Sequence, residues 1–214
     1  MIIGLLNRKG GVGKTTIAVN VAATLAVAGV RVLLVDADPQ ASALSWSSLR
    51  ERDPLFAVVG MARPTLHREI PAIATKFDVV IIDGGPGVND LGRAAILASD
   101  LALVPVQPSP YDVWAAVETV QQIREARRFR PGLKAAFIVN RKVANSTVCR
   151  QAMVTLAQFE DLPVLAAALN QRVIYAESAA HGLAVIEVAP HSEAAREMGN
   201  LVQQILVEKQ RRAA

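Results

Sequence analysis

NRKGGVGKTT, at residues 7–16, is the stretch of sequence that decides the fold. It follows a short apolar run at residues 2–6 and precedes a segment in which Ile17, Val21 and Leu25 recur at helical spacing. Glycines let such a loop fold tightly enough to aim several backbone N–H groups at one anion, and a helix N-terminus adds a positive dipole end. The stretch therefore predicts a phosphate-binding loop between a strand and a helix.

Within this loop, Lys14 is expected to contact the β- and γ-phosphates of a nucleotide, and the Thr15 hydroxyl to bind Mg²⁺. The usual pattern requires glycine at position 8, where this chain has Arg8 followed by Lys9. The extra ammonium group can neutralise phosphate charge beyond its own loop, for instance on a nucleotide held by a facing subunit. A dinucleotide-binding turn is the alternative, but Thr16 stands where its third glycine belongs. The predicted nucleotide-binding residues of the loop are Lys9, Gly10, Gly11, Val12, Gly13, Lys14, Thr15 and Thr16.

The composition favours an α/β protein. Hydrophobic residues make up 52% of the chain and aromatic residues only 4%, so Ala, Val, Leu and Ile must build the core, as in helices that cover a buried parallel sheet. Short β-branched runs alternate with longer segments of helical period. We predict one P-loop NTPase domain over residues 1–214, a mostly parallel twisted sheet with helices on both faces.

The expected elements can be given by residue range. The runs expected as strands are residues 2–6, 31–35, 56–59, 78–82, 101–106 and 134–139, with weaker candidates at 164–168 and 182–188. The segments expected as helices are residues 14–28, 41–50, 65–75, 89–98, 112–128, 146–159, 172–179 and 192–210.

Charge and cysteine content exclude some classes. Lys and Arg total 23 against 19 acidic residues, a mild excess that permits DNA as a partner without requiring it. A single cysteine, Cys149, cannot form an internal disulfide or supply the ligands of an iron–sulfur cluster, which disfavours an electron-transfer ATPase. The apolar run at residues 2–6 is too short for a secretory signal, and no stretch approaches the ~20 residues of a membrane span. We expect a cytoplasmic protein.

Carboxylates follow two of the predicted strands. Asp36 and Asp38 end one strand, and Asp83 ends another after four aliphatic residues, as in a strand that supplies a Mg²⁺ ligand. We expect Asp36 and Asp83, with Thr15, to hold the metal, and Asp38 to orient the attacking water. The alternative is that these aspartates cap helices or form turns.

The base is expected to be adenine. Guanine-binding switches carry an acidic residue in the loop after a late strand, and the corresponding stretch here reads Asn140-Arg141-Lys142 without one. Asn140 can bond a purine edge through its amide and Arg141 can flank the ring. A plain turn after the strand is the alternative. We therefore predict ATP with Mg²⁺, not GTP.

Together these motifs resemble the ParA-type partition ATPases, within the deviant Walker A group that also contains MinD. The resemblance covers nearly the whole chain and rests on residues 9–16 (KGGVGKTT), 35–40 (VDADPQ), 82–84 (IDG) and 105–110 (PVQPSP). Because the chain begins almost at the loop, it looks like the short plasmid type, similar to ParF, without an N-terminal helix-turn-helix domain.

The resemblance implies catalytic roles for three residues. Lys9 would reach across a dimer to the partner's nucleotide, Lys14 would serve its own nucleotide, and Asp38 would position water. It also implies a homodimer on ATP binding, or a polymer in some members, that holds nonspecific DNA. A small centromere-binding protein, like ParB or ParG, would stimulate slow hydrolysis, and the ATP state would associate with the nucleoid and not with a membrane.

The loop at residues 105–110 contains three prolines, which stiffen it at the end of a strand. In ParF-like proteins the corresponding loop lies near adenine, so the resemblance makes Pro108 a nucleotide contact. A rigid connector to a helix capped by Asp112 is the alternative.

Basic residues and the last helix leave two further questions open. Arg124, Arg127, Arg128, Arg130 and Lys134 cluster near one helix end, where they can contact DNA phosphates or simply form a solvated face.

A membrane-cycling regulator like MinD is the alternative function. The segment 192–210 has polar residues where a membrane-surface helix needs basic ones, so we expect it to pack on the protein.

Overall fold

The computed structural model describes residues 1–87, 90–143 and 146–213, the last six of these by their backbone alone. Six strands and nine helices occur in the described residues. The strands are β1 (Ile2–Leu5), β2 (Val32–Ala37), β3 (Ala57–Gly60), β4 (Val79–Gly84), β5 (Leu101–Val106) and β6 (Lys134–Val139). The helices are α1 (Lys14–Val27), α2 (Ser42–Ser48), α3 (Leu66–Ala74), α4 (Asp90–Ala98), α5 (Pro110–Arg127), α6 (Thr147–Leu156), α7 (Ile174–Ala179), α8 (Val185–Val188) and α9 (Glu193–Ala213).

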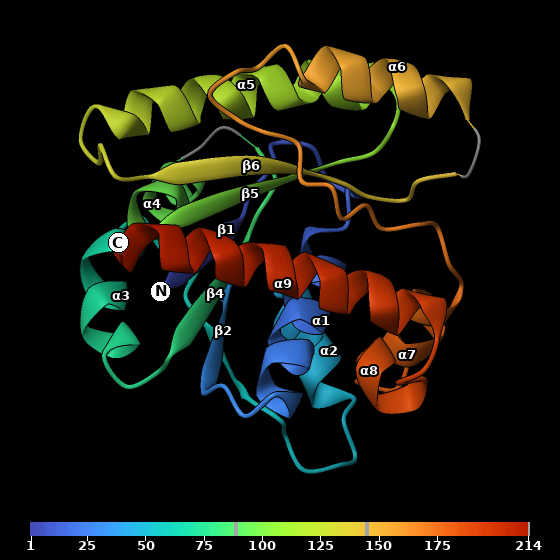
Figure 1. Ribbon diagram of the computed structural model, residues 1–214. Helices are drawn as coiled ribbons and strands as arrows, with labels where there is room; N and C mark the ends of the chain where they lie inside the picture. The colour runs from blue at the N-terminus through green and yellow to red at the C-terminus, as the bar shows by residue number, and fades with distance from the viewer. Residues whose placement is uncertain (88–89, 144–145, 214) are drawn as a thin grey trace.

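The six strands form one parallel sheet in the order β3-β2-β4-β1-β5-β6 (Figure 1). This confirms the predicted α/β fold. Because the strands are parallel, the loops that follow β1, β2, β4, β5 and β6 all lie at one edge. The register sets Leu5 beside Asp83 and Asp36 beside Asp83, so the predicted carboxylates meet next to the loop that follows β1.

Helices cover both faces of the sheet, and each face has its own apolar core. Apolar side chains of α3, α4, α5 and α6 pack on one face, and those of α1, α2 and α9 pack on the other. Figure 1 shows α5 and α6 on one side of the sheet, with α1 and α9 on the opposite side. Ala, Val, Leu and Ile dominate both cores, as the composition predicts.

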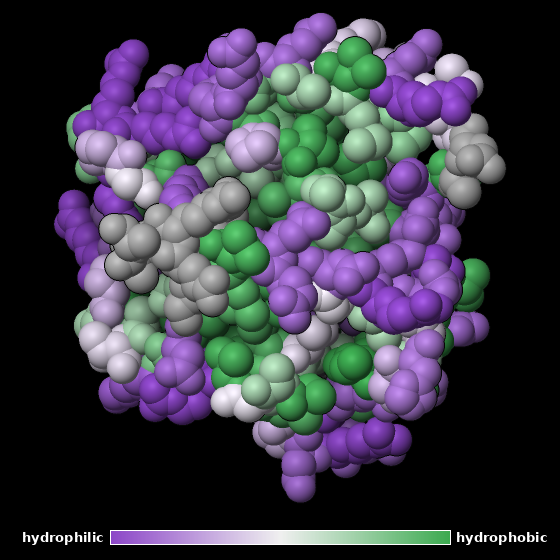
Figure 2. Space-filling model, in the orientation of Figure 1, coloured by the Kyte–Doolittle hydropathy of each residue, from purple (hydrophilic) through white to green (hydrophobic). Residues whose placement is uncertain are grey.

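Two predicted strands did not form. The segment 164–168 makes only an isolated bridge, Val164 with Phe137 of β6, and Figure 2 shows apolar residues gathered on this face between α6 and α9, where that segment crosses. The segment 182–188 contains the short helix α8, which begins at Val185, instead of a strand. The Glu187 carboxylate accepts a hydrogen bond from the Ala184 N–H at 2.9 Å and pairs with Arg50, and both contacts favour a helix start over a strand.

Most predicted helices are confirmed with small shifts at their ends. The start of α5 differs: Ser109 is the N-cap and accepts from the backbone N–H of Asp112, so the alternative in which Asp112 caps this helix was wrong on the cap residue. Asn89, the predicted first residue of the helix that is α4, lies outside the described residues. No helix in the described part of the chain is long and apolar enough to cross a membrane.

Candidate nucleotide-binding site

The loop between β1 and α1 is built around two glycines with left-handed backbones. Gly11 has φ 74° and Gly13 has φ 94°, values that residues with a side chain rarely adopt. A Cβ at Gly13 would also lie 2.3 Å from Nδ2 of Asn140, which donates a hydrogen bond to the Val12 carbonyl at 2.8 Å. The end of β6 therefore closes directly on the loop, and only glycine fits between them.

Side-chain hydrogen bonds to and from the end of β5 hold the loop in place. Nδ2 of Asn7, which is buried, donates to the Pro105 carbonyl at 2.7 Å, and Nε2 of Gln107 donates to the Gly11 carbonyl at 2.9 Å. The sequence analysis did not assign these roles. A polar residue buried at the end of an apolar strand is a signal that could have identified Asn7.

Two further hydrogen bonds connect the loop to α5 and to the segment after β4, at the same edge of the sheet. The backbone N–H of Arg8 donates to the Thr119 hydroxyl of α5 at 3.1 Å, and the Arg8 carbonyl accepts from the Gly87 N–H at 2.8 Å. Gly87 belongs to the chain that leads from β4 to α4. The loop is thus preorganised by contacts that sequence spacing does not reveal.

Lys14 lies within this frame at the start of α1. Its side chain is buried, and Nζ donates to the Lys9 carbonyl at 3.1 Å. Burial lowers the pKa of Lys14, and the nearby carboxylates of Asp83 and Asp38 partly offset that shift. The ammonium group is therefore held inside the loop without a full complement of anions, which suits a group that binds phosphate.

Asp83, at the end of β4, is a completely buried carboxylate. Neither oxygen accepts a hydrogen bond of ordinary geometry from the described residues. Burial, helped by the charges of Asp36 and Asp38, raises the pKa of Asp83 to about 7, although the Thr15 hydroxyl and Lys14 act to lower it. A buried acid that lacks a well-formed hydrogen bond and lies beside a hydroxyl fits a place reserved for a cation.

These residues fit a magnesium–nucleotide complex. Within the described residues, no group of three or more His, Cys, Asp or Glu side chains could hold a metal by itself. Mg²⁺ is commonly bound through one or two carboxylates together with substrate phosphates, so a site formed by Asp83, Thr15 and a nucleotide meets that requirement.

Asp36 makes the contacts expected of a residue that caps a helix, which was the alternative to a magnesium ligand. Its Oδ2 accepts from the backbone N–H groups of Ala43 and Leu44, at 2.9 and 3.0 Å, at the start of α2, and Oδ1 accepts from the Asp38 N–H at 3.2 Å. Both oxygens are thus occupied by backbone donors. A magnesium role for Asp36 stays a prediction, and the contacts that the structure shows position the loop after β2.

Asp38 lies at the same edge and is half-buried. A Cβ added at Gly85 would lie 3.4 Å from the Asp38 carboxyl carbon, so the loops after β2 and β4 touch at this point. Its Oδ1 accepts from the Gln40 N–H at 2.9 Å, and its charge acts on both Lys14 and Asp83. The structure therefore brings two predicted site residues, Asp38 and Asp83, close to Lys14.

Lys9 is turned toward its own subunit. Its Nζ lies 2.7 Å from Oδ2 of Asp112, which is buried at the start of α5 and also accepts from the Ser109 hydroxyl. The second oxygen, Oδ1 of Asp112, has no hydrogen-bond partner in the described residues. The lysine predicted to act across a dimer thus has an intramolecular partner in the single chain.

A cavity of about 360 Å³ opens beside the start of α1 and the end of β6. Thr16, Asn140 and Arg141 line one wall, and Asn140 and Arg141 are the residues predicted to contact the base. Arg141 has a left-handed backbone, φ 51°, which is uncommon for a residue with a long side chain and is often found at functional sites. The size falls within the about 300–1,000 Å³ typical of small-molecule pockets.

The opposite wall of this cavity was not predicted. It includes Asn170, Arg172 and Tyr175, which come from the segment before α7 and from α7 itself. Glu197 of α9 accepts from Nδ2 of Asn170 and from Nη2 of Arg172, both at 2.6 Å. Burial alone would raise the pKa of Glu197, but these donors hold it below its usual value, so the wall is fixed by an ion pair.

Pro108 lies in the loop between β5 and α5, beside Gln107, and is not among the residues that line this cavity. Its loop touches the phosphate loop through the Gln107 contact to Gly11. A direct contact of Pro108 with nucleotide stays a prediction.

Residues 3–185 match the model of a family described as the CobQ/CobB/MinD/ParA nucleotide binding domain. Among curated relatives, the maintenance of carboxysome distribution protein A of Halothiobacillus neapolitanus is 31% identical over 208 residues, which cover 95% of each chain. The chromosome-partitioning ATPase Soj of Thermus thermophilus is 30% identical over 241 residues, covering 97% of this chain and 96% of Soj.

Solved structures show the same fold. Apo McdA from Cyanothece superposes with a TM-score of 0.83 at 17% identity, covering 96% of this chain and 98% of McdA. The septum site-determining protein MinD from Pyrococcus horikoshii, complexed with Mg-ADP, superposes with a TM-score of 0.75 at 21% identity, covering 95% of each chain.

Proposed function

This chain belongs to the CobQ/CobB/MinD/ParA nucleotide-binding family, and from that membership we propose that it is a ParA-type partition ATPase. It hydrolyses ATP with Mg²⁺, as ParA and MinD relatives do. The observation that carries the proposal is the juxtaposition of Lys14, Thr15 and the bare Asp83 carboxylate beside a glycine loop that is tied down on several sides.

In this mechanism the loop N–H groups and Lys14 bind the phosphates, Thr15 and Asp83 hold the metal, and Asp38 orients water. Mg²⁺ supplies charge neutralisation on the phosphates. Asn140 and Arg141, with the wall formed by Asn170 and Arg172, would hold the base. Because Asp38 is the only candidate for orienting water among the residues of the site that the structure describes, we expect slow turnover without a partner.

The ATP-bound form is proposed to be a homodimer in which Lys9 leaves Asp112 and contacts the partner's nucleotide. The Lys9 side chain is only partly buried, so it can exchange one anion for another. Phosphate carries more negative charge than one carboxylate and favours the exchange.

We predict that Lys9→Ala weakens ATP-dependent dimerisation at least tenfold, about 1.4 kcal/mol, because the intersubunit contact is lost. Light scattering with and without Mg·ATP measures this. The single variant leaves Asp112 buried and unpaired, so Lys9→Ala/Asp112→Asn is the matched control that removes this charge. Both variants should lose the dimer; an unchanged dimer yield for either would contradict the assigned role of Lys9.

We predict that Asp38→Ala preserves ATP binding and slows hydrolysis at least about 100-fold, because water is no longer oriented for attack. Rapid quenching of a single turnover measures the step, and size-exclusion chromatography should show the dimer persisting. Gln40→Ala, in the same loop, is the control and should hydrolyse ATP at the wild-type rate. Wild-type turnover by the Asp38 variant would remove Asp38 from the mechanism.

The ATP dimer is proposed to bind nonspecific DNA in the cytoplasm, on the nucleoid, and to be released when a small ParB- or ParG-like partner stimulates hydrolysis. The kinship with Soj supports this. Asp161 pairs with Arg124 and Arg127, which leaves less of the predicted basic cluster for phosphates. A mobility-shift assay tests the proposal: duplex DNA should be retarded with ATP and not with ADP. Retardation that is equal in both, or absent in both, would refute it.

The cargo can be a DNA locus or a large protein body. The chain is similar to a carboxysome distribution protein over nearly its whole length, so a large protein body is a second candidate cargo besides a plasmid or chromosome. Membrane cycling is less well supported, because Leu201, Val202 and Ile205 of α9 are buried against the protein. Sedimentation with liposomes and ATP, without DNA binding, would reverse this order.

A further inference from the structure

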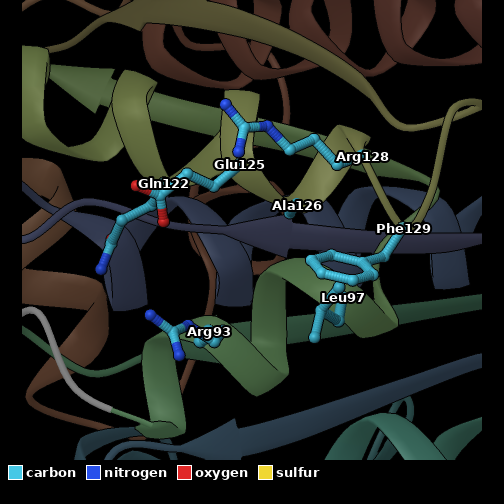
Figure 3. A pocket seen from close by; sticks show the side chains of 7 residues that line it. All are labelled: Arg93, Leu97, Gln122, Glu125, Ala126, Arg128 and Phe129. Carbon is cyan, nitrogen blue, oxygen red and sulfur yellow. The ribbon is translucent and has the colours of Figure 1, made fainter.

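A hollow of about 270 Å³ lies on the surface between α4 and α5, at the end of α5 farthest from Lys9 (Figure 3). Leu97 and Ala126 form its apolar floor, and the Phe129 ring lies over the Leu97 side chain. Phe129 is 80% exposed. Single exposed apolar residues are ordinary, but an exposed phenyl ring beside an apolar hollow is typical of a binding surface.

The frame around this hollow is rigid. Arg130 donates to the Leu97 carbonyl at 2.9 Å and so ties the end of α5 to the end of α4. Arg127 donates to the Leu133 carbonyl at 3.1 Å and pairs with Asp161 at 2.8 Å. A preformed hollow loses little conformational entropy when it is filled, which favours binding.

Two cations at the rim are free to bind a ligand. Within the part of the chain that the structure describes, Arg93 of α4 and Arg128 after α5 pair with no carboxylate, whereas three neighbouring arginines do. An aromatic anchor with arginines beside it is the composition of protein interaction hot spots. The charge that complements this rim is acidic.

Other occupants fit the hollow less well. Its volume is below the about 300–1,000 Å³ of small-molecule sites. Glu125 also lines the hollow and repels any anion beside it, so a partner's carboxylates must lie at Arg93 and Arg128. A DNA backbone presents phosphates but no apolar side group to fill the floor formed by Leu97 and Ala126. A membrane-binding surface needs several protruding apolar side chains, and Phe129 alone protrudes here.

We propose that this hollow docks a short acidic segment of a protein partner. One apolar side chain of the segment enters between Leu97 and Phe129, and flanking carboxylates pair with Arg93 and Arg128. At 1.5 Å per residue, the hollow lies roughly 15–25 Å along α5 from Asp112, so the segment binds without competing for the nucleotide loop. The proposed docking therefore does not require ATP in the loop.

The test uses nucleotide-free protein and a set of fluorescein-labelled heptapeptides. Each has a central Phe, Leu or Ser, flanked on both sides by Glu or by Lys. Fluorescence anisotropy should show the Glu-flanked Phe and Leu peptides binding at least tenfold more tightly than the Ser or Lys peptides, and they should shift the methyl resonances of Leu97. No binding by any Glu-flanked peptide up to 1 mM, or equal binding by the Lys peptides, overturns the proposal.

Variants locate the binding. Phe129→Ala and Arg93→Ala should each weaken the peptide complex at least fivefold, while Val154→Ala and Arg68→Ala, at exposed positions on other helices, should not. All four positions are exposed, so the fold is retained. The proposal is wrong if the peptides do not bind and if duplex DNA or anionic vesicles bind nucleotide-free protein only when Arg128 and Phe129 are intact. The surface would then be a site for DNA or for a membrane.

Discussion

Lys14→Ala is expected to weaken ATP binding at least about 100-fold, about 2.8 kcal/mol. The ammonium group lies inside the glycine loop, where its charge is shielded from water and is hydrogen-bonded only to the Lys9 carbonyl among the described residues. A charged hydrogen bond to phosphate contributes about 1.5–3 kcal/mol in such a site. Fluorescence titration with a ribose-labelled ATP analogue measures the loss.

The fold of this variant should survive. Burial already disfavours the charged form of Lys14, so removing it exposes no structural partner apart from one backbone carbonyl. Lys76→Ala, at an exposed position far from the loop, is the control and should bind like the wild type. If Lys14→Ala keeps full affinity while its melting temperature is unchanged, the loop does not bind the triphosphate as described.

Asp83→Asn is expected to stabilise the nucleotide-free protein while impairing its use of magnesium. The carboxyl has a pKa of about 7 in the folded chain and its ordinary value of 3.8 when unfolded. A raised folded pKa means that the folded chain binds the proton more tightly, so this stabilisation is complete below pH 3.8 and is lost as pH rises through 7. At pH 8 the wild type therefore holds a buried charge whose burial cost Thr15 and Lys14 offset only in part, whereas the amide carries no charge.

We predict a gain of about 1–3 kcal/mol at pH 8 from removing this charge, or about 2–4 °C in melting temperature for each kcal/mol. The gain should shrink as pH falls from 7 toward 4. Scanning fluorimetry across that range measures it. ATP affinity in magnesium should fall at least about tenfold, with little change in EDTA.

The matched control is the neighbouring aspartate. Asp36 accepts three backbone N–H groups, so Asp36→Asn places an amide donor against other donors and should destabilise the protein. The same Asp→Asn substitution on two adjacent strands is thus expected to raise stability at Asp83 and to lower it at Asp36. A loss of stability at pH 8 for Asp83→Asn would show that its carboxylate has a structural partner instead.

The parts of the fold that the sequence predicted are those governed by local pattern. The six main strands were recognised because each is a short apolar run between turn residues, and the phosphate loop because its glycine spacing permits few alternatives. The run at 182–188 misled the prediction, because Glu187 pairs with Arg50, more than a hundred residues away, and favours a helix there. Periodicity carries no information on such a contact.

The candidate site was predictable to a similar extent. Lys14, Thr15 and Asp83 follow from strand and loop order, since parallel strands bring their ends to one edge. The wall that contains Asn170 and Arg172 could not be predicted. Its position depends on Glu197 of α9, which accepts hydrogen bonds from Asn170 and Arg172. These residues belong to no common sequence motif. The Lys9 contact to Asp112 likewise becomes visible only when β1 and α5 are placed together.

Isothermal titration calorimetry of ATP into the purified protein, with and without magnesium, tests the central claim most directly. The account predicts saturable binding of one ATP per chain that is at least about tenfold tighter with magnesium, because Asp83 and Thr15 then contribute to the complex. Absence of binding at millimolar Mg·ATP would contradict it, as would an affinity that magnesium leaves unchanged.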